Sequence, residues 1–222
     1  MSDPTTGTPT AVAPSAAPTL RSCLAGVHAR LGADIGIEGG AEFVRSYGDP
    51  DAELAAVAEA IGCADITVRA KIDVRGDIDR TLSLFPADVV ARIADDWAVL
   101  FSAPGSVTDR VASMQTAAGS SAMVTDVTHL YASFALAGPA LPDALARLTG
   151  WDPATLAPGA ATGAPIADVR ALVVRRQAAV PLVEVSVAME FARYAWRSIL
   201  EVVERLGGAP VGWDALRGRG WR

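Results

Sequence analysis

Few residues in this sequence have the type and spacing that catalysis or metal binding requires. The two histidines, His28 and His129, belong to no HExxH motif, and the two cysteines, Cys23 and Cys63, form no CxxC pair. A structural zinc site normally needs several such ligands at close spacing. The sequence therefore predicts no structural metal site, and it predicts that both cysteines are reduced and buried.

The paired acids Asp95-Asp96 have the residue types of a general acid and base, but they lie between two predicted strands. Adjacent residues in a tight turn point apart, so we interpret the pair as turn residues. The glycine-rich segment 32–40 lacks the Lys-Ser/Thr of a phosphate-binding loop, so we expect it to be a loop, and no G-x-S-x-G elbow occurs. Because these motifs are absent, the sequence argues against a covalent or hydrolytic mechanism.

The elements that must position any site begin with two helices. Helical spacing covers 20–31. Asp49 is an N-cap, Pro50 occupies the first helical position, and Gly62 ends the helix that follows.

The next segment, 64–76, alternates like one half-buried strand, with Arg69, Lys71 and Asp73 on its other face. The remaining predictions, in chain order, are a helix over 78–85, a hairpin about 95–96, a helix after an S-x-x-D cap at 106–109, a strand pair over 122–138, a helix over 139–148, a strand pair over 167–176 and 182–187, and a long helix over 189–206.

Gly138-Pro139 turns a strand sharply into a helix. Glycine and proline mark such a turn without any chemistry, so we interpret it as scaffold. In the alternative interpretation, the free amides of this helix face an anionic part of a ligand.

Together these elements predict an α+β fold of two related units, about 20–120 and 121–222, each an antiparallel sheet with covering helices. Residues 1–19 are rich in Pro, Thr, Ser and Ala and have neither a basic region nor a long apolar run, which is typical of a disordered tail.

Composition narrows the classes of partner. The formal net charge is −6 and the pI is near 4.9, which argues against nucleic acid, because that binding depends on clustered basic residues. No window contains the roughly 18 uninterrupted apolar residues of a membrane span. We therefore expect a cytoplasmic protein that binds neither nucleic acid nor membrane.

Three segments, in order along the chain, resemble the glycine-cleavage T-protein (aminomethyltransferase) superfamily. The first combines HARLGADIGIEGG at 28–40 with YGDPDAELAAVAEAIGCADITVRAKIDVRGD at 47–77. The second is FALAGPALPDALARLTGWDP at 134–153, and the third is VEVSVAMEFARYAWRSILEVVERLGGAPVGWDAL at 183–216. One segment alone is a weak signal, whereas three in the right order are more specific.

The resemblance implies α+β subdomains around a central pocket for tetrahydrofolate, and a role in one-carbon or aminomethyl metabolism. By position, it implies that Glu184, Arg69, Tyr47 and Thr67 line that pocket. Arg69 stands where the family has an apolar residue, and Leu216 stands where it has an arginine.

The resemblance also implies losses. The family's catalytic aspartate lies in a G-G-x-x-D-D segment, and we identify none between Phe85 and the hairpin, so we expect the proton-transferring carboxylate to be absent. We also expect no C-terminal barrel domain. The gamma subunit of heterotetrameric sarcosine oxidase is a truncated relative of this kind.

Three functions stay open. The chain could work beside one-carbon chemistry, either by binding a reduced folate or as a noncatalytic, gamma-like subunit of a flavin- and folate-dependent amine demethylase or oxidase, with a flavoenzyme or another subunit as partner. It could be a standalone enzyme in which Arg69 holds an anionic group and Glu184 orients an amine or acts as a base, although Glu184 is also explained as a cross-strand partner of Arg175 or Arg176. It could be a degenerate homologue that binds nothing small.

Overall fold

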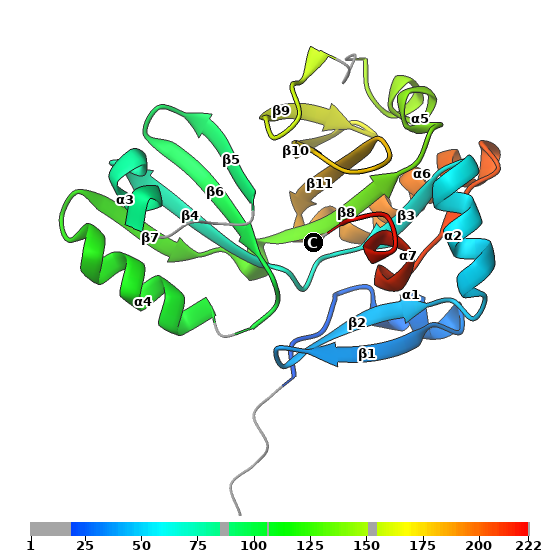
Figure 1. Ribbon diagram of the computed structural model, residues 1–222, viewed down its shortest axis with the longest axis horizontal. Helices are drawn as coiled ribbons and strands as arrows, with labels where there is room; N and C mark the ends of the chain where they lie inside the picture. The colour runs from blue at the N-terminus through cyan, green and yellow to red at the C-terminus, as the bar shows by residue number, and fades with distance from the viewer. Residues whose placement is uncertain (1–18, 85–88, 106, 151–154, 222) are drawn as a thin grey trace, which may run out of the picture.

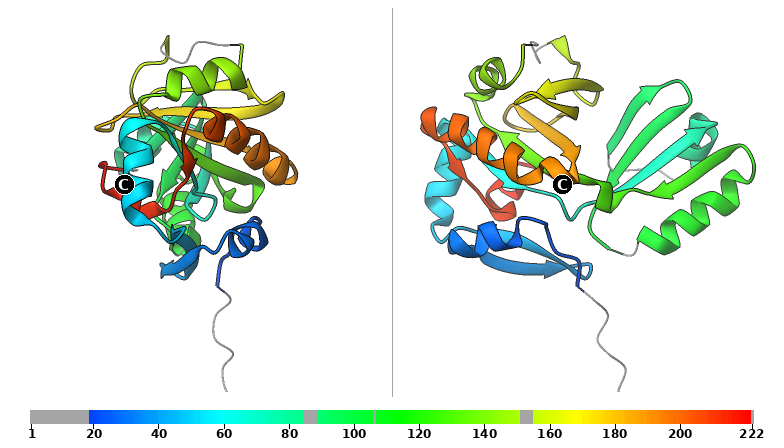
Figure 2. Two further views of the ribbon diagram at one scale, coloured as in Figure 1. Left: turned by 90° about the vertical axis from the view of Figure 1, so that its right-hand side faces the viewer. Right: turned by 180° about the vertical axis from the view of Figure 1, so that it is seen from behind.

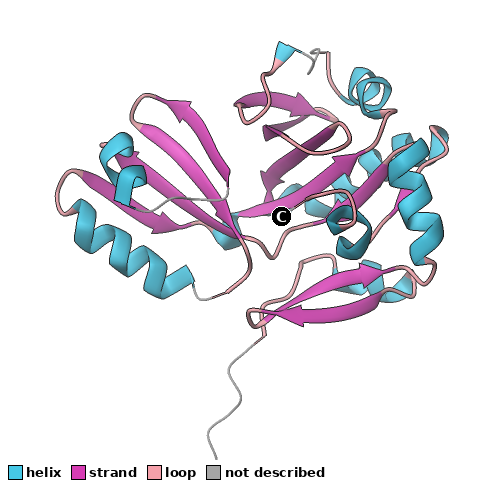
Figure 3. Cartoon of the chain, viewed as in Figure 1, coloured by secondary structure: helices cyan, strands magenta, loops and turns pink. Residues whose placement is uncertain are grey.

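The computed structural model describes residues 19–84, 89–105, 107–150 and 155–221, which form three β-sheets with covering helices (Figure 1). The sheets are antiparallel apart from one two-residue parallel pairing, helices cover them, and the described residues contain no closed barrel, which confirms the predicted α+β class (Figure 3). Most of the predicted tail, 1–18, and Ser106 of the predicted cap lie outside the described residues.

The strands are β1 (Asp34–Glu38), β2 (Ala41–Ser46), β3 (Gly62–Asp65), β4 (Ala70–Gly76), β5 (Val89–Ala94), β6 (Trp97–Ser102), β7 (Ala122–Asp126), β8 (Tyr131–Ala137), β9 (Ala161–Ile166), β10 (Val169–Arg176), β11 (Leu182–Ala188) and β12 (Ala209–Pro210). The helices are α1 (Ala25–Arg30), α2 (Pro50–Glu59), α3 (Ile78–Leu84), α4 (Val107–Ala118), α5 (Leu141–Leu148), α6 (Ala192–Arg205) and α7 (Trp213–Arg217).

The larger sheet has six strands in the order β12-β3-β8-β11-β10-β9, and α5 and α6 cover one face of it (Figures 1 and 2). Helix α6 buries Ala195, Trp196, Ile199 and Val203. Ala195, Ile199 and Val203 recur every four positions, and Trp196 lies three positions before Ile199, so the four side chains form one apolar stripe. The stripe packs in the same cluster as Phe134 of β8, so the main core lies between this sheet and its two helices.

The smaller sheet has four strands in the order β5-β6-β4-β7 and is covered by α3 and α4. Met114 of α4 is fully buried and packs with Ile72 of β4. Beside this core, Phe101 of β6 and Val174 of β10 share a further apolar cluster. The two sheets thus contact each other directly through apolar side chains.

The prediction of one continuous strand over 64–76 is wrong, because the structure divides this segment between two sheets. Residues of β3 pair with β8 and residues of β4 pair with β6 and β7. A turn over 66–69 separates them, since the Asp65 carboxylate accepts the Thr67 N–H (2.8 Å) and the Arg69 N–H bonds to the Ile66 carbonyl (3.1 Å). Both larger sheets contain strands from either side of the division near residue 120 that the sequence suggests.

Burial also differs from the expectation along this segment. Arg69 and Lys71 are among the largest fully buried side chains, not residues of an outer face. Both cysteines are free, as predicted, but only Cys63 is buried and Cys23 is exposed.

The glycine-rich segment 32–40 is mostly a strand and turn, not a loop. Strands β1 and β2 form an antiparallel hairpin whose turn is Gly39-Gly40, both at positive φ. Leu20 donates its N–H to the Gly40 carbonyl (2.9 Å), so the chain before α1 is extended and the helix predicted from residue 20 begins only at Ala25.

Two negative observations concern the described part of the chain. No helix in it is both long and apolar enough to cross a bilayer. Nor does any group of three His, Cys, Asp or Glu side chains there lie close enough together to hold a metal ion.

The Gly138-Pro139 turn packs β8 against the end of α2. Gly138 has φ +143°, and a Cβ there would lie 2.4 Å from the Ala60 carbonyl oxygen. The Ala140 N–H bonds to the same oxygen (2.9 Å), and α5 begins at Leu141 with proline in its first turn. The position requires glycine for close backbone approach, which supports the scaffold interpretation.

We predict that Gly138→Ala lowers the free energy of unfolding by about 2 kcal/mol or more, because the added methyl group meets backbone atoms and the φ is unfavourable. Urea denaturation measures the change. Gly163→Ala is the matched control, since an added Cβ there meets nothing within 4 Å. Equal stability of the two variants would contradict the prediction.

Candidate functional site at the centre of the fold

Of the four residues that the sequence predicts for a pocket, Arg69 and Glu184 lie together. Arg69 Nη1 donates to Glu184 Oε1 at 2.7 Å, and the two side chains are 1% and 0% exposed. Tyr47 and Thr67 instead belong to a second buried cluster, which centres on Asp65. The structure therefore divides the predicted set into two neighbouring groups.

Glu184 points from β11 toward the side of the sheet opposite α6, and three donors reach the same oxygen. Besides Arg69, Arg176 donates to Glu184 Oε1, as the cross-strand alternative predicts, and the Trp221 indole Nε1–H does so at 2.9 Å. Within the described residues, the other oxygen, Oε2, is buried without a hydrogen-bond partner. This carboxylate is therefore engaged by the protein's own donors, with one acceptor oxygen unused.

Trp221 closes this site from the α7 side. Its ring lies edge-on to Trp213 at 5.0 Å between centroids, the Arg69 guanidinium lies 5.2 Å from its centroid, and it is only 4% exposed. Beside it is a cleft of about 460 Å³. The cleft is lined by Arg69, Trp213, Trp221, Glu38, Arg217, Ala103 and Pro104.

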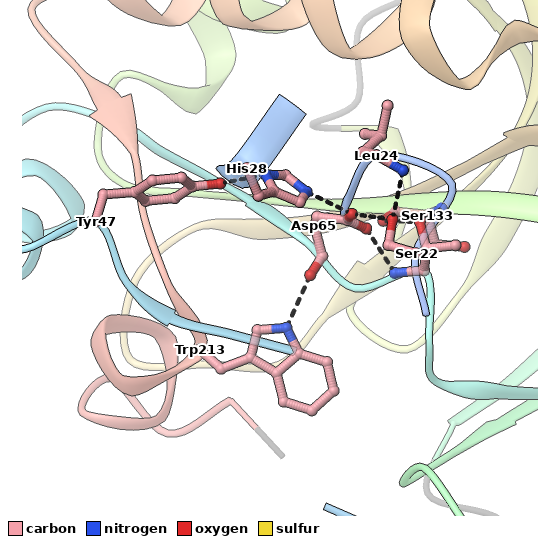
Figure 4. Close-up of polar contacts among 8 residues, drawn as sticks. Ser22, Leu24, His28, Tyr47, Asp65, Ser133 and Trp213 are labelled. Atoms are coloured by element: carbon pink, nitrogen blue, oxygen red, sulfur yellow. Dashed lines mark hydrogen bonds and ion pairs between the residues drawn. The ribbon is translucent and has the colours of Figure 1, made fainter. Parts of the chain in front are cut away.

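Asp65 is the centre of a second polar cluster, which residue-by-residue reasoning missed (Figure 4). Its carboxylate accepts from the Ser22 hydroxyl, from His28 Nε2 at 2.8 Å and from the Thr67 N–H. Its main-chain carbonyl accepts the Trp213 indole Nε1–H at 2.8 Å. The signal that could have found it is a histidine in a helix with apolar neighbours and an aspartate within an apolar strand, since both need buried partners.

The charge state of this cluster follows from its partners. Burial alone would raise the pKa of Asp65, but the hydrogen bond and charge of His28, with the Ser22 and Thr67 bonds, hold it below the ordinary value. Burial and the Asp65 charge raise the pKa of Tyr47. Tyr47 therefore keeps its proton, and its hydroxyl group is hydrogen-bonded to His28 Nδ1 (2.8 Å), while His28 Nε2 is bonded to Asp65.

This arrangement does not activate a nucleophile. In a catalytic triad, histidine lies between the acid and the hydroxyl group that it deprotonates. Here the Asp65 carboxylate lies between Ser22 and His28 and accepts from both. The cluster can stabilise the Asp65 carboxylate and fix the positions of Ser22 and His28. The two ring nitrogens of His28 are bonded to Asp65 and Tyr47, so His28 cannot act as a base toward the Ser22 hydroxyl group.

Lys71, the only lysine of the chain, is also fully buried near this centre. Its Nζ donates to the carbonyls of Thr67 (2.8 Å) and Arg69 (3.0 Å), which belong to the turn between β3 and β4. Burial, partly opposed by the charge of Asp65, lowers the pKa of Lys71 from 10.5 to about 7. The two hydrogen bonds from Lys71 Nζ connect the turn to β4.

Asp95 and Asp96 form the exposed turn of the β5–β6 hairpin, as predicted. The chain reads A-R-I-A-D-D over 91–96, so an acidic pair does stand at the spacing of the family's G-G-x-x-D-D segment, with Ala91 and Arg92 in place of the glycines. Both residues are exposed, in contrast to the buried carboxylates of Asp65 and Glu184.

Solved structures share this architecture. The glycine cleavage system aminomethyltransferase T from Bartonella henselae matches with a TM-score of 0.74 at 19% identity, over 88% of this chain and 60% of that one. The chain has the aminomethyltransferase fold. Heterotetrameric sarcosine oxidase from Corynebacterium sp. U-96, in complex with pyrrole 2-carboxylate, contains a chain that matches with a TM-score of 0.58 at 16% identity, over 72% of this chain and 93% of that one.

At these identities the likeness establishes the aminomethyltransferase fold alone, and it confirms the resemblance of the three segments at that level. The chain spans about 60% of the length of the aminomethyltransferase that it matches. By sequence, no protein-family model and no curated protein matches the chain.

We predict that Asp65→Ala lowers the free energy of unfolding by about 3–5 kcal/mol, because it leaves the buried His28 and the half-buried Ser22 without their acceptor. Urea denaturation at neutral pH tests this. Asp79→Ala is the matched control: that carboxylate pairs with Arg92 but is 85% exposed, so its removal should change stability by less than about 1 kcal/mol. A similar loss in both variants would contradict the role given to Asp65.

The lowered pKa of Lys71 predicts that the free energy of unfolding depends on pH. Between about 7 and 10.5, the unfolded chain holds a proton on Lys71 that the folded protein has released. Lys71 should therefore make the free energy of unfolding rise with pH over this range. We expect Lys71→Met to reduce that rise relative to the wild-type protein in urea denaturation from pH 6 to about pH 10, by the linkage of proton binding to folding. Parallel pH curves would show that Lys71 does not titrate in this way.

Proposed function

We propose that this protein is a noncatalytic, gamma-like subunit of an amine demethylase or oxidase of the sarcosine type, acting beside tetrahydrofolate-linked one-carbon metabolism in the cytoplasm. The observation that carries the proposal is the closed centre of the fold. The resemblance assigns the Glu184 carboxylate to a ligand pocket, but here it accepts hydrogen bonds from Trp221 and from two arginines.

The contacts of Glu184 argue against a ligand role in this conformation. An incoming ligand would have to replace the Trp221 N–H bond and separate Trp221 from Trp213 and Arg69. Burying a large aromatic ring contributes several kcal/mol, so displacement is costly. A centre filled by the protein's own side chains suits a subunit that supplies structure to a complex.

One of the matched structures supports the same assignment. The alignment covers 93% of a chain from heterotetrameric sarcosine oxidase, so a protein of this fold does occur within an oxidase complex. The exposed position of Asp95 and Asp96 fits a protein in which the family's proton transfer is absent.

A second candidate function is supported by the cleft beside Trp221. Its volume of about 460 Å³ is within the range of small-molecule sites, and it combines two tryptophans with arginine side chains. A reduced folate or another small anionic substrate could bind there if Trp221 moves, with Arg69, Glu184, Tyr47 and Thr67 at or behind the site. The protein would then be a folate-binding protein or a standalone enzyme.

Two measurements separate these functions. We expect the tagged native protein to copurify with a flavin-containing or other subunit, and we expect calorimetric titration with 5-formyltetrahydrofolate to give no saturable heat. A Trp221→Ala variant tests whether the indole closes the pocket, with Trp97→Ala as a control for loss of a tryptophan elsewhere.

A monomeric native protein without a copurifying chain would contradict the subunit assignment. Saturable folate binding near micromolar, about 8 kcal/mol, that is lost in Glu184→Gln would favour the second candidate.

A further inference from the structure

Residues of α1 and α6 line a groove on the side of the six-stranded sheet opposite Glu184. Figure 2 shows these two helices in the view from behind. The groove has a volume of about 530 Å³, and its apolar lining is Val27, Leu31, Trp196 and Leu200. Leu31 is 43% exposed, and Val27 and Leu200 are half-buried. Apolar side chains that stay this exposed on one face indicate a surface that another chain covers.

The charged residues along the rim have an ordered arrangement. Arg193 and Arg197 lie in the N-terminal half of α6, and Glu201 and Glu204 lie in its C-terminal half. A helix favours acids near its N-terminus and bases near its C-terminus, so this order opposes the helix macrodipole. The stability of α6 alone therefore does not explain it.

Most of these charges lack a partner within the protein. Glu201 pairs with Arg205 at the helix surface. In the described part of the chain, Arg193, Arg197 and Glu204 take part in no ion pair. Three charges on one helix face are thus available for a partner surface of opposite order.

We propose that the occupant of this groove is a second copy of the same chain, with the two α6 helices antiparallel about a two-fold axis. A face with basic residues at one end and acidic residues at the other is complementary to itself after this rotation. Arg193 would face Glu204 of the second copy, and Arg197 would face Glu201. Both pairs are centred near Ser198 and Ile199, so a single axis satisfies them.

The apolar residues fit the same geometry. Leu200 lies close to the proposed axis, between the charged pairs, and would pack against its counterpart. Leu31 extends the apolar surface from α1. The interface therefore has an apolar centre and a charged rim, the usual anatomy of a protein interface.

Sedimentation velocity over a range of concentrations tests the proposal with the full chain. We expect a reversible dimer that weakens as salt is raised, because the rim pairs are exposed. Arg193→Glu with Arg197→Glu, and separately Glu201→Arg with Glu204→Arg, should each raise the dimer dissociation constant about tenfold or more, because attraction becomes repulsion.

An equimolar mixture of the two charge-reversed proteins should restore association as a mixed dimer, which no loss of folding could produce. Arg170→Glu, an exposed reversal on β10, is the matched control and should leave the dimer unchanged. A wild-type protein that stays monomeric at all concentrations would overturn the proposal. A dimer insensitive to both reversals, or a mixture that fails to associate, would also overturn it.

The proposal does not depend on the proposed function. Copurification of a different subunit tests that function, whereas the mixing experiment uses this chain alone. If the groove is instead covered by a different protein, the purified chain will be monomeric and the charge-reversed variants will lose that protein.

Discussion

The structure depends on how it accommodates the buried carboxylate of Asp65. An ionised carboxylate is stable in a protein interior only when donors surround it. Asp65 obtains its donors from the segment before α1, from α1 itself and from the turn after β3, while its carbonyl holds Trp213 of α7. One charge therefore joins parts of the chain that are far apart in the sequence.

The same turn connects the two buried polar clusters. Thr67 is bonded to Asp65, Arg69 pairs with Glu184, and Lys71 donates back to the carbonyls of both turn residues. The turn also carries the chain from the six-stranded to the four-stranded sheet. Polar groups thus fix one of the two places where the chain passes between these sheets, the other being 127–130 between β7 and β8. Apolar contacts complete the packing of the two sheets.

The protein's own side chains surround the carboxylate of Glu184 at the centre of the fold. Glu184 has the position that the resemblance gives to a pocket residue, yet its neighbours in space are two arginines and an indole. Binding would require the protein to exchange these internal bonds for bonds to a ligand. The surface of α6, in contrast, has exposed apolar groups and unpaired charges, so association with another chain needs no such exchange.

The sequence by itself determined the local elements whose cause is local. The Asp49-Pro50 start of α2, the hairpin about Asp95-Asp96 and the apolar stripe of α6 follow from capping, turn and periodicity rules. Only the tertiary structure decided that 64–76 divides between two sheets, that Arg69 and Lys71 are buried, and that Trp221 reaches Glu184. An alternating pattern shows that side chains face opposite sides. It does not show which side is solvent, because distant segments cover each side.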